Sequence, residues 1–200
     1  MWAWVSTTEM KHIPISRRQL LRTSGVWSVS SCALLGLNAQ AGVLLELEQA
    51  QRLLWSQASN FQAVSLSLGE RELSSIAQLS ESRVPRQFAP RVWEALQAGK
   101  RLGWVITDRV IGKYDLIDYA VAFAGDGAVT GIEILAYRES HGAEIRQANW
   151  RRQFNGRKKP QSMRFADDIK NISGATLSCQ HVTEGVQRLS ALLEVMKWTS

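Results

Sequence analysis

Two apolar runs joined by a short glycine-rich segment constrain the fold of this chain more than any other feature. The runs cover residues 116–124 and 128–136, and Gly125-Asp126-Gly127 lies between them. Both runs are rich in aliphatic and β-branched side chains, which is typical of buried strands. Asp-Gly is favoured in tight turns between strands because glycine tolerates the positive φ that such turns require. The segment therefore predicts an antiparallel β-hairpin.

Other periodic segments on both sides of the hairpin indicate the fold class. Strand-like composition recurs over 91–97 and 102–111, before the hairpin. Helical periodicity of apolar residues occurs earlier, over 42–59 and 66–80, and again in a stripe that begins at Val182. We therefore predict an α+β fold with N-terminal helices, an antiparallel meander sheet built around the central hairpin, and a C-terminal helix.

The first forty-one residues differ from the rest of the chain and resemble an export signal. Ser16-Arg17-Arg18-Gln19-Leu20-Leu21 resembles the twin-arginine motif, and a moderately apolar stretch over 25–37 follows it. Ala39-Gln40-Ala41 supplies a small-x-small cleavage site. We expect residues 1–41 to be a twin-arginine-like signal that is cleaved after Ala41. The protein would then be extracytoplasmic, in the periplasm or on the outer face of the cytoplasmic membrane. The alternative is a basic amphipathic helix that stays attached.

Two details of the same segment leave further alternatives open. A start at Met10 would give a more ordinary signal than a start at Met1. Val29-Ser30-Ser31-Cys32 is a loose lipobox, so a lipid anchor at Cys32 is the alternative to cleavage after Ala41.

The remaining residues, 42–200, are long enough for one domain with a substantial core. We expect a helical part over 42–84 and a part with the sheet and the functional site over 85–200. The signal contains four of the Lys and Arg residues and one of the acidic ones, so its removal lowers the formal net charge from +6 to +3. That modest charge argues against nucleic acid as a partner. The two histidines that remain are too few for a metal site, and the single cysteine excludes an internal disulfide.

A stretch rich in small and hydroxyl residues, 171–179, lies directly before the predicted C-terminal helix. Residues 173–176 should form a tight loop at the N-terminus of that helix, where free backbone N–H groups and the helix dipole suit a phosphate. The small residues in the loop would let a phosphate ester approach the backbone. The alternative is an ordinary helix cap in which Ser173, Thr176 or Ser178 bonds to the first N–H groups.

The sequence Ser173-Gly174-Ala175-Thr176-Leu177-Ser178 resembles the flavinylation motif of the FMN-binding domain family. That family includes the covalent-flavin subunits of sodium-pumping NADH:quinone reductases and of Rnf-type complexes. The resemblance implies that a flavin transferase joins FMN, through its phosphate, to the hydroxyl of Thr176. The family usually has Asp where this chain has Asn171, a position that bears on recognition by the transferase. Asp167 and Asp168 lie upstream and offer a carboxylate at a different position.

A second segment, Glu139-Ser140-His141-Gly142, resembles the part of the same family that lies beside the flavin ring. His141 occupies a position where proline is often found. An ordinary polar turn after a strand is the alternative interpretation. His141 is either a proton donor to reduced flavin or a solvated loop residue. The resemblance extends over roughly 103–193. The cofactor-binding residues that it implies are Thr176, Ser173, Gly174, Ala175, Ser178, Glu139, Ser140 and Gly142.

These features together favour an exported flavoprotein with FMN attached covalently to Thr176. The resemblance implies electron transfer between a membrane donor and an extracytoplasmic acceptor, with a flavin transferase and a membrane-bound or periplasmic redox protein as partners. An exported binding or sensory module of the same fold, with loosely held flavin or none, is the main alternative. A small flavin reductase is a third hypothesis, although no glycine-rich dinucleotide motif supports it.

Overall fold

Five strands form one antiparallel sheet in which each strand pairs with its neighbours in the chain. The structure is a computed structural model, and it describes residues 42–199. The predictions for residues 1–41 lie outside this range. The strands are β1 (Asn60–Val64), β2 (Arg91–Gln97), β3 (Lys100–Ile111), β4 (Leu116–Ala124) and β5 (Val129–Tyr137).

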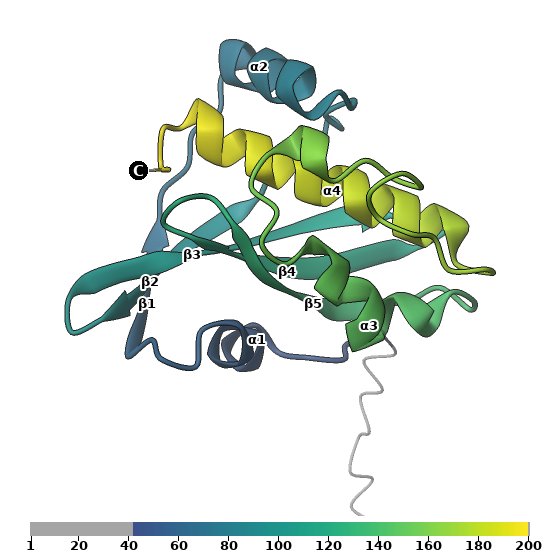
Figure 1. Ribbon diagram of the computed structural model, residues 1–200, viewed down its shortest axis with the longest axis horizontal. Helices are drawn as coiled ribbons and strands as arrows, with labels where there is room; N and C mark the ends of the chain where they lie inside the picture. The colour runs from purple at the N-terminus through teal and green to yellow at the C-terminus, as the bar shows by residue number, and fades with distance from the viewer. Residues whose placement is uncertain (1–41, 200) are drawn as a thin grey trace, which may run out of the picture. The chain divides into compact units, whose positions relative to one another are not determined.

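Helices cover both faces of this sheet (Figure 1). The long helix α4 (Thr176–Val195) lies on one face, and α2 (Glu70–Ser80) packs on the outer side of α4. The short helix α1 (Leu47–Leu54) lies on the opposite face. The connection from β5 to α4 contains η1 (Ala143–Arg146), α3 (Ala148–Arg151), η2 (Arg152–Phe154) and η3 (Pro160–Ser162). The predicted α+β fold, with its meander sheet and its C-terminal helix, is confirmed.

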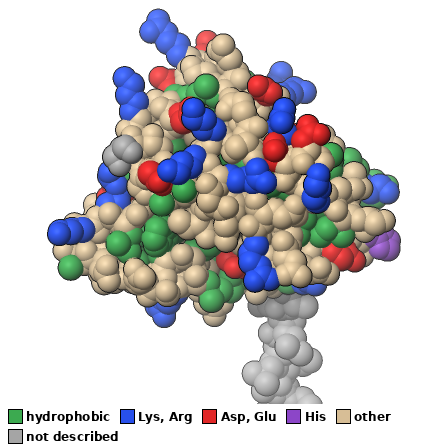
Figure 2. Space-filling model, in the orientation of Figure 1, with side chains coloured by type: hydrophobic (Ala, Val, Ile, Leu, Met, Phe, Trp, Pro, Cys, Tyr) green, Lys and Arg blue, Asp and Glu red, His purple; other side chains and the backbone are tan. Residues whose placement is uncertain are grey.

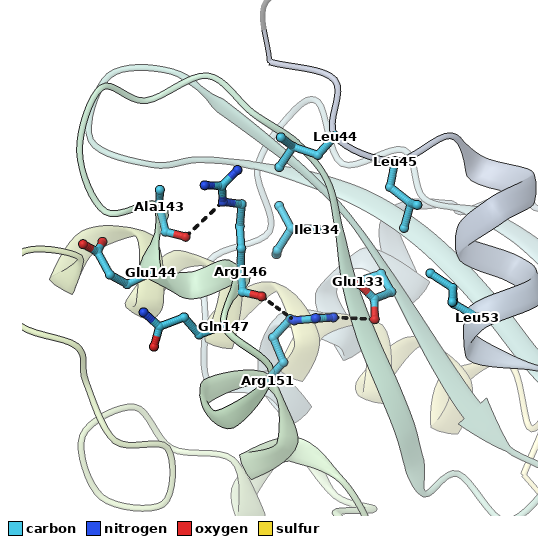
Figure 3. Close-up of a pocket in the computed structure, with 10 residues that line it drawn as sticks. All are labelled: Leu44, Leu45, Leu53, Glu133, Ile134, Ala143, Glu144, Arg146, Gln147 and Arg151. Atoms are coloured by element: carbon cyan, nitrogen blue, oxygen red, sulfur yellow. Dashed lines mark hydrogen bonds and ion pairs between the residues drawn. The ribbon is translucent and has the colours of Figure 1, made fainter.

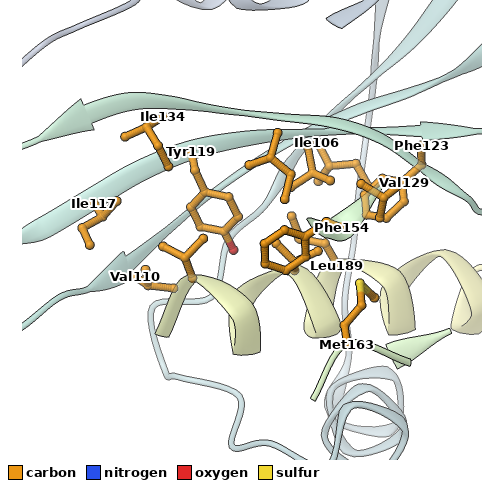
Figure 4. Close-up of a cluster of buried hydrophobic side chains, with 14 of the residues drawn as sticks. Ile106, Val110, Ile117, Tyr119, Phe123, Val129, Ile134, Phe154, Met163 and Leu189 are labelled. Atoms are coloured by element: carbon orange, nitrogen blue, oxygen red, sulfur yellow. The ribbon is translucent and has the colours of Figure 1, made fainter. Parts of the chain in front are cut away.

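The predicted hairpin consists of β4 and β5, and β5 forms one edge of the sheet, so the hairpin is not central as expected. Its turn contains Gly127 at φ +79°, the conformation for which glycine was expected. Alternation along β4 explains the two faces, since Ile117, Tyr119 and Phe123 belong to the core under α4 whereas Ala120 packs with the smaller cluster near α1. Figure 4 shows the large side chains between the sheet and α4, with the ring of Tyr119 extending toward the helix.

Helix α4 is buried on nearly all sides because it lies between the sheet and α2. The predicted apolar stripe at Val182, Val186, Leu189 and Leu193 is buried. Polar residues of α4 are buried too, and Thr183, Gln187 and Ser190 bond to backbone carbonyls. The Thr183 hydroxyl donates to the carbonyl of Cys179 over 2.6 Å. A helix enclosed in this way can hold a functional residue at its N-terminus in a fixed position.

The first predicted helix is shorter than expected. It was predicted over 42–59, but α1 occupies only Leu47–Leu54. The segment 43–45 instead extends along the edge of β5, where Val43 forms a bridge with Ala136. An unpaired sheet edge offers backbone bonding groups that compete with helix formation. Tertiary pairing therefore overrides the local helical pattern.

Strand β1 was not predicted from the sequence. Its residues, Asn60–Val64, alternate poorly between buried and exposed positions because β1 is an edge strand held mainly by β2. Within residues 42–199, no helix has the length and apolar composition needed to cross a membrane. On the face shown in Figure 2, lysine and arginine side chains are interspersed with acidic ones and do not form one continuous patch.

Candidate functional site

Three segments that are distant in sequence meet at the N-terminus of α4 and enclose a cavity of about 240 Å³. They are the turn between β3 and β4, the segment after β5, and the loop before α4. The residues around the cavity are Lys113, Tyr114, Glu139, Ser140, His141, Gly174, Ala175, Thr176, Leu177 and Ser178. The structure thus brings most of the predicted site residues together at one place.

The N-terminus of α4 is free of any side-chain cap. Ala175 occupies the N-cap position, Thr176 is the first helical residue, and no side chain in the described part of the chain caps this end. The predicted alternative of a capping hydroxyl from Ser173, Thr176 or Ser178 is therefore wrong. Gly174 has φ +85°, and a Cβ at this position would meet nothing within 4 Å. The first N–H groups of α4 thus face an open loop, as an anion site requires.

Asn171 and Thr176 are joined directly. The Nδ2 of Asn171 donates a hydrogen bond to the Oγ1 of Thr176 over 3.0 Å, and both residues are exposed. The two aspartates upstream do not supply a carboxylate here. Asp168 accepts from the Arg164 guanidinium at 3.2 Å, and Asp167 lies 4.0 Å from the same group. Neither aspartate therefore takes the place of the carboxylate that the resemblance implies near this hydroxyl.

Tyr137 ties the segment after β5 to α4. Its hydroxyl donates to the carbonyl of His141 over 2.5 Å and lies 3.2 Å from the Oγ of Ser178. Gly142, at φ +86°, lies so close that a Cβ there would be 2.6 Å from the Tyr137 hydroxyl. Burial raises the pKa of Tyr137, so the hydroxyl remains a proton donor. No role was predicted for the Tyr137 hydroxyl, because its two partners depend on how the chain folds back.

Glu139 holds the turn between β3 and β4. Its Oε1 accepts from the N–H groups of Tyr114 at 2.6 Å and Asp115 at 3.0 Å. A Cβ at Gly112 would approach this oxygen to 2.5 Å, so the turn and the carboxylate are in close contact. Partial desolvation raises the pKa of Glu139, but the backbone N–H groups outweigh it and lower the pKa below its ordinary value. Glu139 therefore fixes one wall of the cavity as an ionised carboxylate.

Two residues at the edge of the cavity were not recognised in the sequence. Tyr114 is 74% exposed, and the ammonium group of Lys113 lies 4.9 Å from the centre of its ring. His181 does not line this cavity, but its Nδ1 lies 2.6 Å from the carbonyl oxygen of Ile111 and so joins α4 to the end of β3. Ser140 and His141 are exposed beside these residues.

A larger depression of about 670 Å³ lies elsewhere, between the segment around α1 and the connection after β5 (Figure 3). None of the predicted site residues lines it. Its arginines already have partners, since Arg151 lies 2.5 Å from Glu133 and Arg146 donates to the carbonyl of Ala143. This depression thus lies away from the residues that the family resemblance implies, which gather around the smaller cavity at Thr176.

Residues 112–191 match the family model of the FMN-binding domain. The matched segment includes every residue that lines the cavity at Thr176. No curated protein matches the chain. The resemblance found in the sequence is confirmed for this segment, and the match supports FMN as the cofactor of a flavin-binding protein.

Proposed function

We propose that this chain, which contains a segment matching the FMN-binding domain, carries FMN as a phosphoester on Thr176 and serves as an electron-transfer module. The observation that carries the proposal is the position of the Thr176 hydroxyl. It is exposed on the first residue of α4, beside N–H groups that no side chain caps. The match to the FMN-binding domain includes this residue.

The surroundings of Thr176 fit the phosphate of FMN. The first turn of α4 offers N–H donors and the positive end of a 20-residue helix dipole. Gly174 leaves space above the backbone, and Lys113 supplies a positive charge at the edge of the same cavity. No acidic side chain faces the hydroxyl from Asp167 or Asp168, because both lie beside Arg164. The phosphate would therefore meet helix N–H donors and one cation, while Glu139, the carboxylate in the cavity wall, is bonded to backbone N–H groups of the turn.

The remaining walls fit the flat ring of a flavin. Leu177 is 41% exposed and Tyr114 is 74% exposed, so both offer apolar surface that a ring could cover. Tyr137 and Glu139 fix the two loops that bear the other lining residues. FMN, when bound, supplies the redox chemistry, and the residues of the chain hold it, limit water around it and set its electrostatic surroundings.

Location and partners belong to the same proposal. The twin-arginine-like segment in residues 1–41 supports export, and attachment at Thr176 requires a flavin transferase as a transient partner. Attachment would keep the cofactor from dissociating outside the cytoplasm. A membrane-bound or periplasmic redox protein would then exchange electrons with the flavin.

A second candidate function follows from Asn171. With an amide in place of a carboxylate, the side chain donates to the Thr176 hydroxyl and does not accept its proton. If that arrangement prevents attachment, the chain is an exported binding or sensory module that holds flavin loosely or lacks it.

One experiment separates the two candidates. The full chain is co-expressed with an active flavin transferase, directed outside the cytoplasm, and analysed for flavin fluorescence in a denaturing gel. Thr176→Ala is the test variant and Thr130→Ala, at an exposed position on β5, is the control. A fluorescent band in the wild type and the control, absent from Thr176→Ala, supports the phosphoester. A dark wild-type band beside a labelled reference substrate supports the binding module.

The electron-transfer role has its own test. The purified flavinylated chain should accept electrons from a chemical reductant and release them to a small oxidant, without consuming NADH by itself. Rapid oxidation of NADH by the isolated chain would instead support a flavin reductase.

A further inference from the structure

A separate cavity of about 400 Å³ lies between α4, the end of β3 and the segment 83–87 that leads from α2 toward β2. Four arginines and a single glutamate are among the residues that line it. The lining residues are Arg83, Pro85, Arg86, Gln87, Arg109, Val110, Ile111, His181, Glu184 and Arg188. None of them belongs to the proposed FMN-binding residues, so the cavity requires its own explanation.

Arg188 is the unusual residue of this cavity. It is only 3% exposed, and its Nε has no hydrogen-bond partner among the residues that the structure describes. One terminal nitrogen donates to the carbonyl of Arg83 at 3.5 Å, which is a long bond. No carboxylate of residues 42–199 forms an ion pair with this guanidinium. A buried cation without a partner is costly, so an anion bound beside Arg188 would stabilise this arrangement.

The nearest buried acid does not fill that role. Asp108 feels the charge of Arg188, but its Oδ2 accepts from the hydroxyl of Tyr119 at 3.1 Å. The other acid at the cavity, Glu184, accepts from the Nε2 of Gln180 at 2.9 Å. Both carboxylates therefore have other partners.

Two of the remaining arginines are free to bind a ligand. Arg83 and Arg86 are exposed, and neither side chain has an ion pair in the described part of the chain. Arg109 is different, because its Nε donates to Asp118 at 2.9 Å. The cavity thus has one buried and two exposed guanidinium groups without anionic partners. Guanidinium groups bind carboxylate and phosphate through paired hydrogen bonds.

We propose that this cavity is a second binding site, which takes a small anion with carboxylate or phosphate groups through Arg188, Arg83 and Arg86. A volume of about 400 Å³ suits a small metabolite. The site adjoins the cavity at Thr176, because Ile111 and His181 line it while Lys113, two residues after Ile111, lines the other. An anion bound here would lie next to the redox site. The proposal does not depend on flavin attachment.

The test measures anion binding to the full chain by titration calorimetry and by thermal unfolding. Inorganic phosphate and succinate are the two probes, and sodium chloride at equal ionic strength is the reference. The variants are Arg83→Gln/Arg86→Gln, which changes only exposed side chains, and Arg188→Met. Arg52→Gln/Arg71→Gln is the matched control, because these two arginines are exposed and lie outside the cavity.

We expect one probe to bind with saturation and to raise the unfolding temperature beyond the effect of sodium chloride. The double variant should weaken binding about tenfold, as expected for the loss of two charge-assisted contacts. Arg188→Met should weaken it about thirtyfold or more, because a buried charged contact is lost. The control pair should bind as the wild type does, and so should Thr176→Ala, which separates this site from the flavin.

The two probes distinguish the source of the anion. Preference for succinate indicates a carboxylate ligand, and preference for phosphate indicates a phosphorylated one. Equal effects of both probes and sodium chloride would overturn the proposal. So would unchanged binding in the Arg83→Gln/Arg86→Gln protein, which can be judged even if Arg188→Met fails to fold.

Discussion

The amide of Asn171 donates to the hydroxyl oxygen of Thr176 over 3.0 Å. This bond occupies a lone pair of the oxygen that must attack a phosphate if FMN is to be attached. A carboxylate of the same size would accept the hydroxyl proton and make the oxygen a better nucleophile. We therefore predict that Asn171→Asp speeds FMN transfer to Thr176 by about tenfold or more, against the roughly 100-fold or more that a full general-base effect typically supplies.

The rate is followed as fluorescence of denatured samples taken during incubation with the transferase and its flavin substrate. Asp167→Asn is the control, since that carboxylate lies beside Arg164 and away from the threonine. An Asn171→Asp protein that is labelled no faster than the wild type would contradict the argument from the direction of the hydrogen bond.

Gly185 on α4 is required by the hydroxyl of Tyr119, because a Cβ at position 185 would overlap that oxygen. Gly185→Ala should lower the free energy of unfolding by about 2 to 3 kcal/mol, the usual cost of forcing extra volume into a packed core. In a Tyr119→Phe background the same change should cost less, because the overlapping atom is gone. Urea denaturation of the wild type, the two single variants and the double variant gives the interaction energy between positions 119 and 185. Equal costs in the two backgrounds would show that the overlap is relieved elsewhere.

Local patterns predicted the hairpin and the C-terminal helix, because both depend on residues close in sequence. The turn of the hairpin depends on the backbone conformation of Asp126-Gly127. The apolar stripe of α4 follows from the spacing of residues along the helix and can be read without knowing what packs against it. The cavity walls depend on long-range contacts. The N–H of Tyr114, in the turn between β3 and β4, donates to Glu139 in the segment after β5, and no periodicity in the sequence indicates such a contact. The family resemblance supplied most of the residues around Thr176, whereas Tyr114 was found only in the structure.

Glu139 should stabilise the domain only while it is ionised. Glu139→Gln retains the shape but weakens the bonds from the N–H groups of Tyr114 and Asp115. We expect a loss of about 0.5 to 1 kcal/mol at pH 7, allowing for solvent screening of this partly exposed group. The folded-state pKa is lowered from the ordinary 4.5, so the contribution is present above pH 4.5 and disappears as pH falls through the lower folded value.

Denaturant titrations at pH 7 and near pH 3 measure this difference. The free energies of unfolding of the wild type and Glu139→Gln should differ at pH 7 and become equal in acid. Glu144→Gln, an exposed position in η1, is the control and should be close to the wild type at both pH values. If the difference in free energy of unfolding between the wild type and Glu139→Gln stayed the same in acid, the charge of the carboxylate would not be what stabilises the turn.

Asp108 should show the opposite dependence on pH. Burial raises its pKa above the ordinary 3.8, against the lowering effects of the Arg109 backbone, Arg188 and Tyr119. The protonated form is thus favoured in the folded protein. Its contribution to stability is fully present below pH 3.8 and is lost as pH rises through the raised folded value.

Asp108→Asn removes this titration while keeping the size of the side chain. The free energy of unfolding of the wild type, relative to the variant, should therefore fall as pH rises from about 3.8 through the folded pKa, and then level off. The comparison cancels all groups that the two proteins share. Binding of an anion beside Arg188 would partly neutralise the charge that favours ionised Asp108, so the fall should be larger in the presence of the bound probe. A difference between the proteins that stays constant from pH 3 to pH 8 would show that Asp108 titrates as it does in the unfolded chain.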